Sequence, residues 1–221
     1  MVTLNVYGEV VTIAVDRVVN AGYSGRDEDA VQAHIDELVE DGIPAPERVP
    51  TTYELAPNVL RSDPGTIGVV GDDTSGETEF GLLVTRDDAY VVAASDQTDR
   101  TLERESIQKA KRIAPNVISA RAWRLADVRD HWDDIEIRAW NTVDGDRELY
   151  QESTLGAIRE PEALCDVVRE RYGDPLDGTA VLSGTVATVG GELSPGSAFE
   201  VELVDPIEER SLSVSYGVET L

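Results

Sequence analysis

The chain has 221 residues, 41% hydrophobic and 29% charged, which is enough for a compact core and excludes a wholly disordered chain. Its 19 basic and 44 acidic side chains give a formal net charge of -25, which repels phosphate backbones and anionic lipid, so we expect neither nucleic acid nor a membrane as partner. The sequence shows no secretory signal and no apolar run of about eighteen residues, and we therefore expect a cytoplasmic protein.

The basic residues are almost all arginine. Only Lys109 and Lys111 are lysines among the 19. Strong acidity with few lysines is typical of chains that work in concentrated salt, because screening shortens self-repulsion while carboxylates keep binding water and cations. We therefore expect a halophilic, haloarchaeal protein in which most carboxylates serve solvation.

The amino-terminal region begins with alternating residues. Residues 4–15 predict two strands around a turn at Tyr7-Gly8-Glu9, and residues 18–23 predict a third extended segment. Residues 27–41 carry apolar side chains at helical spacing and predict an amphipathic helix that stops at Gly42. Residues 42–50 include three prolines in the last seven positions and predict a loop.

The middle of the chain alternates between strands and one helix. Strands are predicted at 66–70, 77–84 and 90–95, and residues 85–89 join the last two in a hairpin. Residues 101–113 predict a single helix with Leu102, Ile107, Ala110 and Ile113 on one side.

The remainder is mostly extended. A helix is predicted at 161–172, with Pro161 near its first turn and Gly173 as its stop. An Asp144-Gly145 turn joins the first two of five strands, predicted at 135–142, 147–151, 179–183, 198–204 and 210–218. Many strands with few helices predict an α+β, mostly β fold. We expect one domain over 1–221, with amino-terminal strands, helix and loop at 1–60 and a β-rich core at 61–221.

Glu77-Thr78-Glu79 places two carboxylates on one face of a strand. If Asp87-Asp88 forms a two-residue turn, Glu79 pairs with Asp96 across the hairpin and Glu77 lies diagonal to it. Three converging carboxylates repel one another unless a cation lies between them, and Mg²⁺, Mn²⁺ and Ca²⁺ accept such ligands. A one-residue slip would send Asp96 to the opposite face, and solvated surface acids are the alternative.

Several motifs in order resemble the fumarylacetoacetate hydrolase superfamily, and in particular a compact branch of it. The first two resemble its Asn-Asp-x-Ser/Thr-x-Arg and Glu-x-Glu segments: Ser95-Asp96-Gln97-Thr98-Asp99-Arg100 and Glu77-Thr78-Glu79. Weaker similarities follow at Asn141-Thr142-Val143-Asp144-Gly145-Asp146, Tyr150-Gln151-Glu152-Ser153-Thr154, Leu182-Ser183-Gly184-Thr185 and Leu193-Ser194-Pro195-Gly196, and Gly22-Tyr23 is similar to the family's Gly-x-Asn-Tyr start. The resemblance implies a fumarylacetoacetate-hydrolase-like β-roll or sandwich with a few peripheral helices, and a homodimer.

The resemblance also implies a metal site and the groups around it. Glu77, Glu79 and Asp96 would ligate Mg²⁺ or Mn²⁺, with Ca²⁺ as a further candidate. Lys111 is similar to the family's active-site lysine, although Lys109 is two residues away. The residues implied to bind substrate are Tyr23, Arg100, Gln151 and Thr185.

One family feature is missing. Hydrolytic members carry a His near the first motif that activates water together with an acid, whereas this chain has Tyr23-Ser24-Gly25-Arg26-Asp27-Glu28 there. Asp27 or Glu28 would replace the His as base, or Arg26 would anchor an anionic substrate. The difference disfavours water-driven cleavage and leaves dehydration, hydration or decarboxylation open.

The sequence thus predicts a divalent-metal-dependent C–C hydrolase or lyase. Its substrate would be a small 2-oxo or β-dicarbonyl carboxylate that reacts through a metal-stabilised enolate. One alternative is a dehydratase or hydratase of a 2-keto-3-deoxy sugar acid. An alternative from another class is a non-catalytic, acidic, β-rich binding module.

Overall fold

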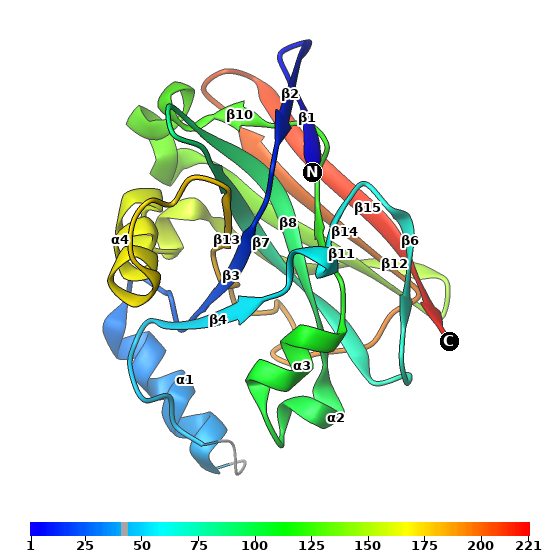
Figure 1. The fold of residues 1–221 in the computed structure, drawn as a ribbon. Helices are drawn as coiled ribbons and strands as arrows, with labels where there is room; N and C mark the ends of the chain where they lie inside the picture. Colours follow the sequence, from blue (N-terminus) through cyan, green and yellow to red (C-terminus); the bar gives the residue numbers. More distant parts are fainter. Residues whose placement is uncertain (41–43) are drawn as a thin grey trace.

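The computed structural model describes residues 1–40 and 44–221, and most of its regular structure is strand (Figure 1). The strands are β1 (Val2–Val6), β2 (Glu9–Ile13), β3 (Arg17–Gly22), β4 (Thr51–Leu55), β5 (Leu60–Ser62), β6 (Gly65–Val69), β7 (Thr74–Val84), β8 (Ala89–Asp99), β9 (Asn116–Ile118), β10 (Trp123–Arg124), β11 (Glu136–Val143), β12 (Asp146–Thr154), β13 (Thr179–Leu182), β14 (Ala198–Asp205) and β15 (Arg210–Thr220). The α-helices are α1 (Glu28–Glu40), α2 (Arg100–Glu103), α3 (Ile107–Ile113) and α4 (Pro161–Tyr172). Short 3₁₀ helices lie at Pro57–Val59, Leu125–Asp127, Arg129–Asp134 and Leu155–Ala157.

The strands form two main sheets and a separate hairpin. The larger sheet has the order β4-β3-β13-β7-β8-β9-β5, with β10 paired to β8. The smaller sheet has the order β12-β11-β14-β15-β6, and β1 pairs with β2 alone. Because β3 and β4 precede residue 61 and lie in the larger sheet, the amino-terminal part and the later strands build one sheet together.

The two central strands of the larger sheet, β7 and β8, are buried on both faces. On one face Phe80 and Val91 pack in a core that the smaller sheet completes with Leu203. On the other face Leu83 packs in a second core with Leu4 of the β1–β2 hairpin. Burying one such side chain stabilises the fold by about 1.5–3 kcal/mol, so the two cores together hold β7 and β8 firmly from both sides.

Two predicted hairpins are confirmed. Tyr7 and Gly8 have φ angles of 53° and 93°, and Asp144 and Gly145 have φ angles of 53° and 91°. Two successive positive φ angles give the tight turn whose twist matches that of the flanking strands. Gly8 and Gly145 therefore stand where glycine is favoured.

The helices at 27–41 and 161–172 are confirmed as α1 and α4. The predicted end of the first at Gly42 lies outside the described residues. The described part of the proline-rich loop, 44–50, has no helix or strand. Gly173 ends α4 with a φ of 81°. No described helix is long and apolar enough to cross a membrane.

The region 101–113 forms two helices, so the predicted single helix is wrong. Ser106, between α2 and α3, has extended backbone with φ of −167° and ψ of 106°. Because α3 starts anew after this break, its buried face differs from the predicted one. Lys111 is buried, whereas Ile113 is 52% exposed.

Asp205 holds the loop between β14 and β15. Its buried carboxylate accepts the N–H groups of Ile207 and Glu208, both at 3.1 Å, and Nε of Arg210 at 3.0 Å. His131 Nε2 lies 3.0 Å from the same carboxylate. Burial raises the pKa of Asp205, but His131, the Glu208 N–H and Arg210 outweigh burial and hold its pKa below the ordinary value.

Removing this charge should weaken the fold in a pH-dependent way. We expect Asp205→Asn to lower the free energy of unfolding by about 1–3 kcal/mol at neutral pH, because charge-assisted hydrogen bonds are lost. Since the folded pKa is lowered, the carboxylate stabilises the fold above the ordinary aspartate pKa of about 3.9, and its contribution disappears as the pH falls through the folded value. Urea unfolding at a series of pH values should show the two proteins converging in acid, and a constant gap would contradict this account.

Candidate active site

The three candidate carboxylates share one face of the β7–β8 hairpin. The register places Glu77 opposite Asp96 and Glu79 opposite Ala94, so Glu79 is the diagonal neighbour of Asp96. Side chains on a strand alternate between faces, and these three belong to the face that carries Leu83 and the second core. The shared face predicted from the sequence is therefore present.

The turn of this hairpin differs from the predicted one by one residue. Thr85 N donates to Asp88 O at 2.9 Å, and the Thr85 hydroxyl bonds both the N–H and the carbonyl of Asp88. Arg86-Asp87 therefore forms the tip, and the predicted pairing of Glu79 with Asp96 is wrong. Moving the turn by one residue moves the pairing by two, so the shared face is preserved.

Lys111 reaches these carboxylates from α3. Its Nζ contacts the carboxylate of Asp96 and lies 3.6 Å from Glu77 Oε2. Asp96 is fully buried, Glu79 is 1% exposed and Lys111 is 6% exposed. Lys109 is exposed on the same helix. Of the two lysines, the structure thus places Lys111 beside the carboxylates.

Arg100 adjoins the same cluster at the start of α2. Its Nη2 lies 3.6 Å from Glu77 Oε1, and its Nη1 donates to Glu103 Oε2 at 2.8 Å. Its Nε donates to the Ser75 hydroxyl at 2.8 Å. The guanidinium charge is therefore shared between two carboxylates and held in place by β7.

Acidic groups outnumber basic ones in this buried region. Burial and the nearby Asp96 raise the pKa of Glu79 well above its ordinary value. Burial also raises the pKa of Glu77, but Arg100 and Lys111 outweigh it and the net shift is downward. Burial alone would lower the pKa of Lys111, and Asp96 and Glu77 outweigh it, so the amine stays an ammonium. A further cation would relieve the repulsion that remains.

The residue types fit a hard divalent cation. Carboxylate oxygens are the ligands that Mg²⁺ and Mn²⁺ prefer, and Asp96 Oδ1 is buried without a hydrogen-bond partner. Within residues 1–40 and 44–221, no three acidic, His or Cys side chains are spaced to hold a metal as they stand. Lys111 contacts Asp96 and Glu77 instead and supplies part of the positive charge that the cluster needs.

Gly184 anchors the third carboxylate. Its N–H donates to Glu79 Oε2 at 3.0 Å. Its φ is +81°, and a Cβ at this position would collide with the Ser24 hydroxyl and lie 3.0 Å from the Ala21 carbonyl oxygen. Only glycine fits both the backbone conformation and the space.

Gln151 and Thr185 hold the strand segment between the two glutamates. Gln151 Oε1 accepts the Thr78 N–H at 2.9 Å, and the Thr185 hydroxyl donates to Thr78 O at 2.8 Å. Gln151 Nε2 donates to the Thr185 hydroxyl at 2.7 Å. The structure thus brings both residues to Thr78, with their polar groups bonded to protein atoms.

The other predicted residues divide into two groups. Burial raises the pKa of the Tyr23 phenol, and the negative charge of Glu103 raises it further. Arg26 instead pairs with Asp133, at 2.7 and 2.8 Å. Asp27 and Glu28 also have their contacts away from the cluster.

Both candidate bases are engaged at the start of α1. Asp27 accepts the N–H groups of Asp29 and Ala30, both at 3.1 Å, and so caps the helix. Glu28 is exposed and lies 3.2 Å from Arg159. The structure does not bring either carboxylate to the cluster.

Three polar side chains near the cluster, one half-buried and two fully buried, were not predicted. The ring centroid of Tyr53 lies 5.9 Å from Lys111 Nζ, and burial raises the pKa of its phenol. Asn20 and Asn116 are fully buried and hydrogen-bonded to each other. An asparagine that follows Val18-Val19 in an apolar strand is the available signal for Asn20, whereas the sequence predicts no strand at Tyr53 or Asn116.

Comparison with protein families identifies a relationship over most of the chain. Residues 21–216 match the model of the family DUF2848, described as a protein of unknown function. The chain belongs to this family. No curated protein matches it in sequence.

Solved structures share the fold of this DUF2848 protein. A protein assigned as a fumarylacetoacetate isomerase/hydrolase from Oleispira antarctica is 16% identical, with a TM-score of 0.72 over 99% of this chain and 100% of that one. A fumarylacetoacetate hydrolase family protein assigned in Yersinia pestis CO92 is also 16% identical, with a TM-score of 0.70 over the same shares. A 2-keto-3-deoxy-D-arabinonate dehydratase complexed with magnesium and 2,5-dioxopentanoate is 16% identical, with a TM-score of 0.65 over 95% of this chain and 74% of that one. The predicted mostly β, fumarylacetoacetate-hydrolase-like fold is confirmed.

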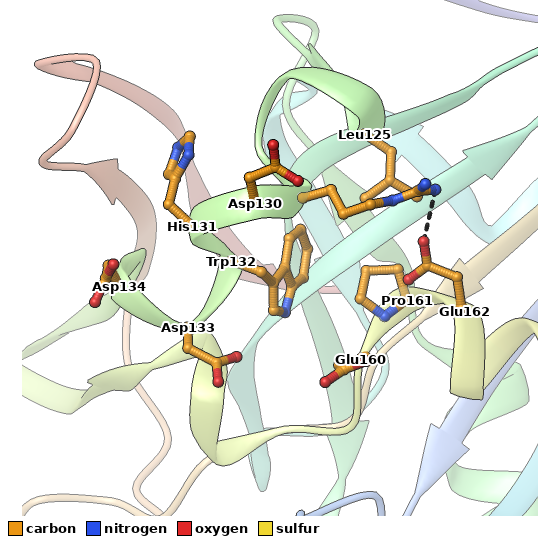
Figure 2. Close-up of a pocket in the computed structure, with 10 residues that line it drawn as sticks. Leu125, Asp130, His131, Trp132, Asp133, Asp134, Glu160, Pro161 and Glu162 are labelled. Carbon is orange, nitrogen blue, oxygen red and sulfur yellow. Dashed lines mark ion pairs between the residues drawn. The ribbon is translucent and has the colours of Figure 1, made fainter.

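A cavity of about 260 Å³ lies elsewhere in the DUF2848 protein, between the 3₁₀ helix Arg129–Asp134 and the start of α4. Figure 2 shows Trp132 in this region beside Pro161, with Glu162 on the far side of Pro161, and Arg129 pairs with Glu162 at 2.6 Å. Five of its lining residues are acidic, one is arginine and one is histidine, which disfavours an anionic ligand. None of its lining residues belongs to the predicted site, so the buried carboxylate cluster is the better candidate.

Loss of the Lys111 charge should leave the buried Asp96 carboxylate without a cation in contact with it. We expect Lys111→Met to lower the free energy of unfolding by about 3–5 kcal/mol in EDTA. Lys109→Met removes the same atoms from an exposed position of α3 and should change it by less than about 0.5 kcal/mol. Added Mn²⁺ should recover part of the loss in Lys111→Met. Urea unfolding with EDTA or Mn²⁺ measures all of these effects, and equally small losses in both variants would contradict the placement of Lys111.

Proposed function

We propose that this DUF2848 protein is a divalent-metal-dependent enzyme that acts on a small 2-oxo or β-dicarbonyl carboxylate, as a C–C hydrolase or lyase. The observation that carries the proposal is that the buried Glu79 and Asp96 and the largely buried Glu77 share one face with Lys111. Acids that serve solvation belong on the surface, and withdrawing three of them largely from water is unfavourable unless positive charge opposes them. A catalytic site is a reason to retain such a cluster.

Glu77, Glu79 and Asp96 would hold Mg²⁺ or Mn²⁺, with Ca²⁺ as the third candidate. When bound, the cation supplies a Lewis acid that polarises the substrate carbonyl and stabilises the enolate that develops when a neighbouring bond breaks. Support comes from the chemistry of the donor set and from the magnesium in the dehydratase that shares the fold.

Lys111 and Arg100 would supply the remaining chemistry. The Lys111 ammonium holds a proton on Nζ beside Asp96, where it can protonate the developing carbanion or the leaving group. Arg100, which is 7% exposed, would orient Glu77 and attract the substrate carboxylate. Tyr23, Gln151 and Thr185 are proposed to bind substrate as well.

Dehydration or hydration of a 2-keto-3-deoxy sugar acid is a second candidate, and the positions of Asp27 and Glu28 favour it. Neither of these carboxylates reaches the cluster, since one caps α1 and the other pairs with Arg159. Hydrolysis needs a base that activates water, whereas dehydration needs one acid–base group and charge stabilisation. Product masses distinguish the two reactions, because hydrolysis splits the substrate with addition of water and dehydration yields one product lighter by one water.

Glu79→Gln should separate an enzyme from a non-catalytic acidic binding module. Because burial raises the Glu79 pKa well above its ordinary value, removing the carboxylate charge should leave the metal-free protein as stable or more stable. Mn²⁺ binding and turnover of a panel of 2-oxo acids should fall by at least about 100-fold, since a proposed ligand is lost. Glu152→Gln, at a half-exposed position paired with Arg138, serves as the matched control. Unaltered Mn²⁺ binding and turnover in Glu79→Gln would exclude the proposed site.

We also propose that the protein is adapted to concentrated salt, as a haloarchaeal origin would require. The support is the net charge of -25 and the scarcity of lysine. Salt should screen the self-repulsion of the folded chain, so the urea midpoint should rise from low salt to multimolar KCl. A stability maximum at low salt would contradict this proposal. The homodimer, the cytoplasmic location and the single domain stay predictions from the sequence.

A further inference from the structure

A pair of buried amides joins two distant strands of the larger sheet. Asn20 of β3 and Asn116 of β9 are both fully buried, and Asn20 Nδ2 donates to Asn116 Oδ1 at 2.8 Å. Three strands separate β3 from β9 in the sheet order. The hydrogen bond therefore spans the concave face of a strongly curled sheet, which is the face that carries the candidate site.

The register places this pair next to the metal-binding candidates. Asn116 is directly opposite Asp96 in the antiparallel pairing of β8 and β9. Residues so paired share a face and have Cβ atoms about 4.5–5.5 Å apart. On the other side, Asn20 is directly opposite Tyr53 of β4, whose ring lies below Lys111 Nζ. The amides thus complete a ring of side chains that returns through Tyr53 and Lys111 to Asp96.

Both amides leave one polar atom unsatisfied. Among the described residues, Asn20 Oδ1 and Asn116 Nδ2 are buried without a hydrogen-bond partner, as is Asp96 Oδ1. A buried polar atom without a partner is unfavourable, whereas two apolar side chains of similar shape can fill the same space without that cost. Stability alone therefore does not account for two asparagines here.

We propose that Asn20 and Asn116 form a positioning pair for the metal site. Asn116 lies directly opposite Asp96 and would keep the Asp96 carboxylate in place by packing beside it, without a hydrogen bond to Oδ1, so that Oδ1 stays available to the cation. The hydrogen bond from Asn20 fixes Asn116. The inference rests on the proposed function. Groups that support a metal ligand from outside typically change metal affinity by about 10–100-fold when they are removed. Both asparagines act through Asp96.

The double variant Asn20→Leu/Asn116→Leu tests the pair, because it removes both amides and leaves neither one stranded. We expect its urea midpoint in EDTA to equal or exceed that of the unchanged protein, because unsatisfied polar atoms are removed. Its dissociation constant for Mn²⁺, measured by titration calorimetry, should rise about 10–100-fold. A purely structural pair predicts the reverse, namely lower stability with unaltered affinity.

Asn141→Leu is the matched control. Asn141 lies on β11 of the smaller sheet and is 3% exposed. Its Nδ2 donates to Ser194 O at 2.8 Å. This variant should lose stability and keep its Mn²⁺ affinity. Unaltered Mn²⁺ affinity in the double variant, or its failure to fold, would overturn the positioning pair and leave the proposed function standing. Failure of the unchanged protein to bind Mn²⁺ would overturn the proposed function and this inference with it.

Discussion

The contact between the Lys111 ammonium and Asp96 is the interaction on which the candidate site depends. Asp96 and Glu79 point into the interior of a curled sheet, and an unopposed carboxylate in such a place is strongly unfavourable. The only lysine or arginine side chain that contacts Asp96 among the described residues is that of Lys111. The break at Ser106 matters for this reason, because it starts α3 in the phase that turns Lys111 inward. Local helix geometry, sheet register and charge balance are thus coupled at one point.

The apolar parts of the fold make this polar cluster tolerable. β7 and β8 have one face in the core between the two sheets, and the far end of the other face packs under the β1–β2 hairpin. The polar end of β7 is then fixed by hydrogen bonds: Gln151 and Thr185 bond to the backbone of Thr78, and the Gly184 N–H bonds to Glu79. A strand held along its whole length can keep repelling carboxylates at fixed positions, and fixed positions are what metal ligation requires.

The sequence predicted those features that depend on periodicity within one segment. The shared face of Glu77 and Glu79 follows from the two-residue repeat of a strand. Asp96 stays on that face despite the displaced turn at Arg86-Asp87, because the pairing moved by an even number of residues. The sequence did not predict contacts that depend on several segments of the chain. Asn116 lies on a three-residue strand that is too short for a periodic signal. Its bond to Asn20 requires the curl of a whole sheet, and the inward turn of Lys111 requires a break that helix propensity alone does not predict.

Burial separates the few acids that carry chemistry from the many that do not. Surface pairs such as Arg147 with Glu200, at 2.9 Å, are partly exposed, and such pairs contribute little to stability. Lysine and arginine are also not interchangeable at the site. A guanidinium brings five donors that need partners, whereas the Lys111 amine has three and fits a buried space beside Asp96. In a chain that otherwise uses arginine, the site therefore explains Lys111, and nothing in the structure explains Lys109. The positions of a few charges support an enzyme, because the total charge alone describes only how the surface meets its solvent.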